Sequence, residues 1–157
     1  MRAIIAAVAL VFAIGVVMPI DADARVPSKV EKWGCTFRTV RFISGGESPT
    51  MWLSGGVARN CDERQQGTAT LSLLQDVPDG PDRVLKRVTY PWSVGPSGVE
   101  PFMLVGGYCS PDAPPPTEPF YLWMKVVRKG QPGSASVATA NVVNPCPEGT
   151  YPVVMAE

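Results

Sequence analysis

The sequence predicts an all-β protein: an antiparallel, immunoglobulin-like β-sandwich of seven or eight short strands with two disulfides. After residue 25 no window shows a helical apolar period, whereas alternation of apolar and polar residues recurs. The 17 prolines and 15 glycines are typical of many turns between short strands. The four cysteines, an even number, indicate two disulfides in an exported chain. A small β-barrel fits the same pattern and is the alternative.

The first half of the chain contains four predicted strands. Residues 35–43 alternate, with Cys35, Phe37 and Thr39 on one side, and residues 50–54 form a shorter apolar segment. Residues 68–75 alternate most clearly, because three aliphatic side chains face one way and Thr68, Thr70 and Ser72 face the other. Residues 83–90 follow after an Asp-Gly turn, which is a common hairpin signal.

The second half contains four more predicted strands. Residues 99–105 are nearly all apolar, although Pro101 favours an edge position or a bulge. Residues 120–128 alternate, and the turn KGQPG leads into a return strand at residues 134–143. Residues 151–155 are expected to close the sheet. A pair of glycines ends each of the apolar segments 43–46, 53–56 and 104–107. Glycine is favoured at the end of a strand or at a bulge, because it adopts positive φ without strain.

The N-terminus is expected to be a signal peptide over residues 1–24, followed by a single sandwich domain over residues 25–157. Arg2 precedes an uncharged apolar run, and Ala22 and Ala24 provide the small residues of a cleavage site. An uncleaved membrane anchor is the alternative, since the run is just long enough to span a bilayer. The expected location is secreted or periplasmic, without membrane attachment after cleavage.

The absence of histidine narrows the possible chemistry. It excludes a Ser-His-Asp triad, a Cys-His pair and any histidine metal site. We therefore expect no enzyme activity, no cofactor and no metal. A hydrolase that uses Glu100 with Asp112 or Glu118 is a weaker alternative. Because the formal charge is zero, nucleic acid is not an expected partner.

The cysteines are predicted to pair as Cys35–Cys61 and Cys109–Cys146. If residues 120–128 and 134–143 form a hairpin, Cys109 and Cys146 lie at the same end of the sheet. By the same reasoning, Cys35 opens one strand and Cys61 follows soon after the next.

Three aspartates in DVPDGPD, at positions 76, 79 and 82, supply oxygen atoms of the kind calcium prefers. Their spacing is not that of an EF-hand. An ordinary turn is the favoured interpretation of this segment.

The candidate binding residues are Pro114, Pro115, Pro116, Tyr121, Trp123 and Lys125. The proline run is first a stiffened connection and second a binding loop. The side of residues 120–128 that bears the two aromatics is expected to be a second buried layer, and an exposed patch is the alternative.

These features predict a non-enzymatic binding module that engages a protein or a surface glycan. One form of this hypothesis is an inhibitor that presents a rigid loop to a hydrolase. A structural envelope or coat component is the alternative from another class.

Overall fold

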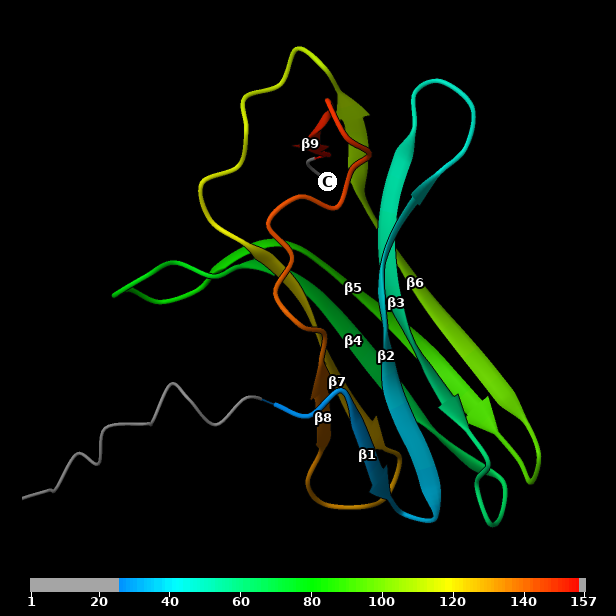
Figure 1. Cartoon of the computed structure of the whole chain (residues 1–157). Coiled ribbons are helices and arrows are strands. Elements are labelled where there is room, and N and C mark those ends of the chain that lie inside the picture. The colour runs from blue at the N-terminus through cyan, green and yellow to red at the C-terminus, as the bar shows by residue number, and fades with distance from the viewer. Residues whose placement is uncertain (1–25, 156–157) are drawn as a thin grey trace, which may run out of the picture.

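The computed structural model describes residues 26–155, and every regular element in this range is a β-strand (Figure 1). The predicted signal segment lies outside the described residues. The strands are β1 (Lys29–Lys32), β2 (Cys35–Gly45), β3 (Met51–Arg59), β4 (Gln65–Gln75), β5 (Arg83–Val94), β6 (Val99–Ser110), β7 (Phe120–Arg128), β8 (Ala135–Ala138) and β9 (Tyr151–Val154).

The strands form two antiparallel sheets that lie one against the other (Figure 1). Sheet A has the order β1-β2-β3-β6-β9, and sheet B has the order β5-β4-β7-β8. Neither sheet closes on itself, so the predicted sandwich is confirmed and the barrel alternative is wrong. The strand order differs from the ABED and CFG sheets of an immunoglobulin domain, and each disulfide joins a strand to a connecting segment rather than two strands.

The inward-facing side chains of the two sheets meet in one aromatic-rich core. Trp52 of β3 is fully buried, and its ring centroid lies 5.6 Å from that of Phe120 in β7. Phe37 of β2 lies edge-on to Trp92 of β5, again with centroids 5.6 Å apart. Both pairs cross from one sheet to the other. Such pairs contribute about 0.5 to 1.5 kcal/mol beyond the burial of their area.

The alternation predicted for β4 and β7 is confirmed by the burial of their side chains. One side of each strand faces the core. The buried sets are Ala69, Leu71 and Leu73 in β4, and Phe120, Leu122, Met124 and Val126 in β7. Because the other side of each strand faces outward, these two central strands fix which residues form the outer face of sheet B.

β1 is the one strand in residues 26–155 that the sequence did not predict. It is four residues long and has a single well-packed apolar side chain, Val30, which leaves little alternation to detect. It pairs with β2 through a two-residue turn in which Trp33 has φ 54° and Gly34 has φ 72°. Positive φ at both positions is the geometry of a type I′ hairpin.

Two of the glycine pairs lie inside strands, which corrects the predicted strand ends at residues 54 and 105. β3 and β6 continue to Arg59 and Ser110. A Cβ at Gly56 would lie 2.4 Å from the Met124 sulfur, and one at Gly106 would lie 2.1 Å from the Trp52 ring. These glycines make room for core side chains, whereas Gly46 (φ 101°) follows the end of β2 as expected.

Both predicted disulfides are present. Cys35 pairs with Cys61 with a Cα–Cα distance of 4.0 Å, and Cys109 pairs with Cys146 at 5.7 Å. The second disulfide ties β6 to the segment that leads into β9. This pairing follows from the hairpin of β7 and β8, although regular strand pairing in β8 ends at Ala138 rather than near residue 143.

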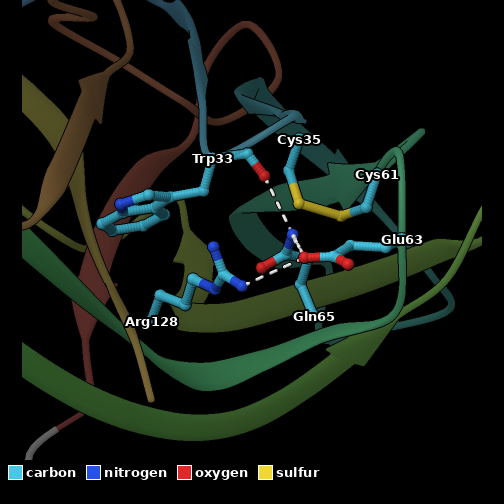
Figure 2. Close-up of a disulfide and its surroundings, with 6 residues drawn as sticks. All are labelled: Trp33, Cys35, Cys61, Glu63, Gln65 and Arg128. Atoms are coloured by element: carbon cyan, nitrogen blue, oxygen red, sulfur yellow. Dashed lines mark hydrogen bonds and ion pairs between the residues drawn. A yellow bond between two sulfur atoms is a disulfide. The ribbon is translucent and has the colours of Figure 1, made fainter. Parts of the chain in front are cut away.

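Figure 2 shows that the first disulfide lies beside a polar network that joins the two sheets. The buried Gln65 of β4 donates from Nε2 to the Trp33 carbonyl at 3.0 Å and to Oε1 of Glu63 at 3.4 Å. Arg128 of β7 donates from Nη2 to the same Glu63 oxygen at 3.3 Å. Because Trp33 belongs to the β1–β2 turn of sheet A, hydrogen bonds connect the two sheets at this end of the sandwich, next to the Cys35–Cys61 disulfide.

Pro101 lies in a part of β6 that pairs with β3 only, because β9 pairs with Gly107–Ser110 alone. The predicted edge position of Pro101 is thus confirmed.

Residues 26–155 contain no helix long and apolar enough to cross a membrane.

Candidate functional site

The outer face of sheet B brings together the predicted residues Tyr121, Trp123 and Lys125. All three point away from the core, because their neighbours in β7 face inward. The two aromatic side chains are partly exposed and Lys125 is exposed. Register with β4 and β5 arranges this face in rows: Val84, Leu74 and Tyr121; Arg87, Ser72 and Trp123; Thr89, Thr70 and Lys125; and Pro91, Thr68 and Val127.

The central residue of the second row, Ser72, is shielded from solvent. Ser72 belongs to the outward side of β4, yet its relative exposure is 0%. Its neighbours on either side are Arg87 and Trp123, and the Arg87 Nε donates to the Ser72 Oγ at 3.1 Å. We infer that the two larger side chains cover the serine. The row therefore presents a guanidinium beside an indole at the molecular surface.

Tyr121 occupies the next row with its hydroxyl fixed. The hydroxyl donates a hydrogen bond to the Asp82 carboxylate, which lies just before β5. Burial raises the pKa of the Tyr121 phenol, and the hydrogen bond to Asp82 and the negative charge of that carboxylate raise it further. The phenol therefore stays protonated near neutral pH, and its ring is held at one position on the face.

The face continues into a hollow of about 550 Å³ at its far end. Apolar side chains of Pro91, Trp92 and Val127 contribute to its lining, and the remaining lining is largely polar. The polar and glycine lining residues are Gln66, Gly67, Thr68, Ser93, Glu100 and Lys129. Small-molecule sites typically combine apolar lining residues with a few polar groups that orient the ligand.

The structure separates the predicted proline run from the strand residues of this face. Pro114, Pro115 and Pro116 lie between β6 and β7, in the segment that passes from sheet A to sheet B (yellow in Figure 1). Pro114 and Pro115 are exposed, and Pro116 is partly buried. The end of this segment is fixed, because the Asp76 amide donates to the Pro119 carbonyl at 2.9 Å. This geometry fits a stiffened connection.

The carboxylates of the hydrolase alternative do not form a pair around one site. Glu100 lies at the start of β6 and Asp112 follows its end, so the ten-residue rise from Glu100 to Ser110 alone separates them by roughly 33 Å. Glu118 accepts a hydrogen bond from the Gln75 Nε2 at 3.0 Å. A carboxylate pair that cleaves a glycoside is separated by only about 5 to 9.5 Å.

The aspartates of the turn before β5 also have other partners. Asp76 accepts a hydrogen bond from Asn141, and Asp82 accepts one from Tyr121. Among residues 26–155 no group of three or more His, Cys, Asp or Glu side chains is placed to hold a metal ion.

Sequence reasoning missed Arg87, Ser72 and Asp82 as parts of this site. The alternation in β4 placed Ser72 on the polar side, but only the register shows that Arg87 and Trp123 flank it. Comparison of the chain with protein-family models, curated proteins and solved structures gave no match. The assignment of the site therefore rests on its geometry alone.

Proposed function

We propose that the chain is an exported, non-enzymatic binding module that holds a glycan with acidic groups on the outer face of sheet B. The observation that carries this proposal is the row in which Arg87 and Trp123 flank the covered Ser72. The two disulfides support a secreted or periplasmic location, because such bonds persist in oxidising compartments.

The chemistry of the face suits a sugar chain. Partly exposed aromatic rings at Tyr121 and Trp123 offer apolar surface with little conformational entropy to lose, since each ring is part of a rigid strand. They are two residues apart on one strand, which is a spacing of about 6.6 Å. Successive sugar units can therefore contact successive rings.

The charges on the face favour an acidic glycan over a neutral one. Arg87 and Lys125 are both exposed and flank Trp123 from different rows, whereas the Asp82 carboxylate is engaged by Tyr121. A guanidinium is well suited to a carboxylate or sulfate group, because its donors form paired hydrogen bonds with two oxygens. Glycans that carry uronate or sulfate groups are the ligand class we propose.

Affinity gel electrophoresis against polysaccharides of opposite charge character tests this function. The acidic probes are polygalacturonate, alginate and hyaluronan, and the neutral probes are dextran and mannan. We expect at least one acidic polysaccharide to retard the wild-type protein. Retardation by none of the acidic polysaccharides would overturn the proposal, and equal retardation by neutral ones would overturn its charge requirement.

Substitutions then assign the binding to the face. Trp123→Ala and Lys125→Ala should each weaken retardation, with about a tenfold loss of affinity for each 1.4 kcal/mol of lost contact. The matched control is Arg38→Ala, because Arg38 is an exposed cation on the opposite sheet. Circular dichroism of each variant checks that the fold is intact.

A further inference from the structure

The outer face of sheet A carries a contiguous set of apolar side chains. Alternation in β2, β3 and β6 sends one set of side chains into the core, so the other set must face outward. Four of the outward side chains remain substantially exposed: Val40 (36%), Ile43 (46%), Met103 (52%) and Val99 (60%). Leu53, Val57, Pro101 and Val105 complete this set.

Strand register makes these side chains one continuous surface. Val40 and Met103 lie on either side of Gly55 in one row, and Ile43 and Val105 lie on either side of Leu53 in the next. The bulge in β2 between Val40 and Ile43 is what presents both of these residues outward. Scattered single apolar residues are ordinary on a surface, but a contiguous set over three strands marks an interaction site.

The charged side chains at the paired positions of this face lie at one end. They belong to Lys29 and Glu31 of β1, which pair with each other at 2.8 Å, and to Arg38 and Arg59 of β2 and β3. One further exposed cation, Arg41, lies in the β2 bulge beside Val40. A two-fold axis that lies between the two copies and runs across the strands reverses the row order of the partner face, so the basic end of each copy lies opposite the Ile43 and Met51 end of the other. The like charges are then kept apart while the apolar rows meet.

The size of the face suits a second copy of the chain. The long strands β2, β3 and β6 pair over about nine residues, and β1 and β9 have four residues each. At about 4.8 Å per strand and about 3.3 Å per residue, the whole face has a flat area of roughly 550 Å² before side-chain relief is added. A stable interface buries about 800 Å² of accessible surface on each partner. The formal net charge of the chain is zero, so two copies meet without overall repulsion.

We propose that the chain forms a two-fold symmetric dimer through the outer face of sheet A. The two sheet B faces then lie on opposite sides of the dimer and point away from each other. This arrangement goes beyond the proposed glycan binding, because the dimer forms whether or not sheet B holds a ligand. Because the two binding faces point in opposite directions, a dimer with ligand bound would hold two separate glycan molecules rather than one glycan at both faces.

Sedimentation equilibrium of the full chain, purified in the form that the cell produces, tests the dimer. We expect twice the monomer mass for the wild type and the monomer mass for Met103→Lys, because a buried unpaired ammonium is costly. The matched control is Val84→Lys on sheet B, where the native side chain is 46% exposed and the dimer should persist. Circular dichroism confirms folding of both variants.

Each result decides the proposal. A monomeric wild type at the highest soluble concentration would overturn it. A dimer that survives Met103→Lys would also overturn it, since the contact would then lie elsewhere. Loss of the dimer in Met103→Lys alone would support it, whatever the outcome of the glycan experiments.

Discussion

Arg87 of β5 donates a hydrogen bond from Nε to the Ser72 hydroxyl of β4, 3.1 Å away, and Trp123 lies on the other side of that serine. The serine is buried on the outer side of a sheet, where a small polar residue would ordinarily meet water. The hydrogen bond therefore holds the Arg87 side chain in a defined position on the face, which lowers the entropy cost of binding.

The first prediction concerns this hydrogen bond. Arg87→Ala leaves the Ser72 hydroxyl without its partner, so the free energy of unfolding should fall by about 1 kcal/mol. Urea denaturation measures the change. Arg83→Ala on the same strand is the control, because Arg83 is exposed and should change stability by less than about 0.5 kcal/mol. Equal effects of the two substitutions would show that the bond does not order the face.

The second prediction concerns pH. Burial and Asp82 raise the pKa of Tyr121 above the usual value of about 10, so the folded state holds this proton more tightly than the unfolded state. The free energy of unfolding should therefore fall as the pH rises above about 10, and less so in Tyr121→Phe. Phenolate absorbance should show one of the four tyrosines ionising late. A titration unchanged by Tyr121→Phe would contradict this assignment.

The third prediction separates the roles of the disulfides. β9 pairs only with Gly107–Ser110 of β6, and the chain before it is tied down by Cys109–Cys146. Replacing both of these cysteines with serine should cost about 3 to 4 kcal/mol on the chain-entropy model. Hydrogen exchange should show lost protection in β9 and retained protection in β4 and β7. Retained protection in β9 would mean that its strand pairing suffices without the disulfide.

The fourth prediction concerns close packing at Gly106. A Cβ there would lie 2.1 Å from the ring of the fully buried Trp52, and protein interiors are close-packed, so the ring can move aside only at a cost. Gly106→Ala should therefore lower the free energy of unfolding by about 1 to 3 kcal/mol. Gly45→Ala is the control, because no atom lies within 4 Å of the added methyl group. Thermal unfolding compares the two, and equal melting temperatures would contradict the packing argument.

Much of this fold could be predicted because local pattern and core burial agree. β7 has the predicted bounds, and both disulfide pairings follow from cysteines that flank predicted hairpins. The predicted ends of β3 and β6 were wrong, because the sequence alone cannot distinguish a glycine that makes room for Met124 or Trp52 from a glycine that ends a strand. β1 was missed because four residues with one packed apolar side chain carry almost no periodic signal.

The candidate site was only partly predictable for a different reason. Tyr121, Trp123 and Lys125 lie on one strand, so alternation alone groups them on one side. Arg87 joins them only through the register of β4 and β5, which contains a bulge near Leu73. A bulge shifts every later pairing by one residue, and nothing in the local sequence specifies it. The apolar outer face of sheet A depends on a bulge in β2 in the same way.

Amide chemical-shift mapping tests the central claim, that the outer face of sheet B holds an acidic glycan, most directly. The probe is a short uronate oligosaccharide cut from whichever polysaccharide retards the protein. We expect the shifts to concentrate at Ser72, Arg87, Tyr121, Trp123 and Lys125 and to be absent from the outer face of sheet A. Shifts that concentrate on residues 111–119 or on sheet A instead would contradict it.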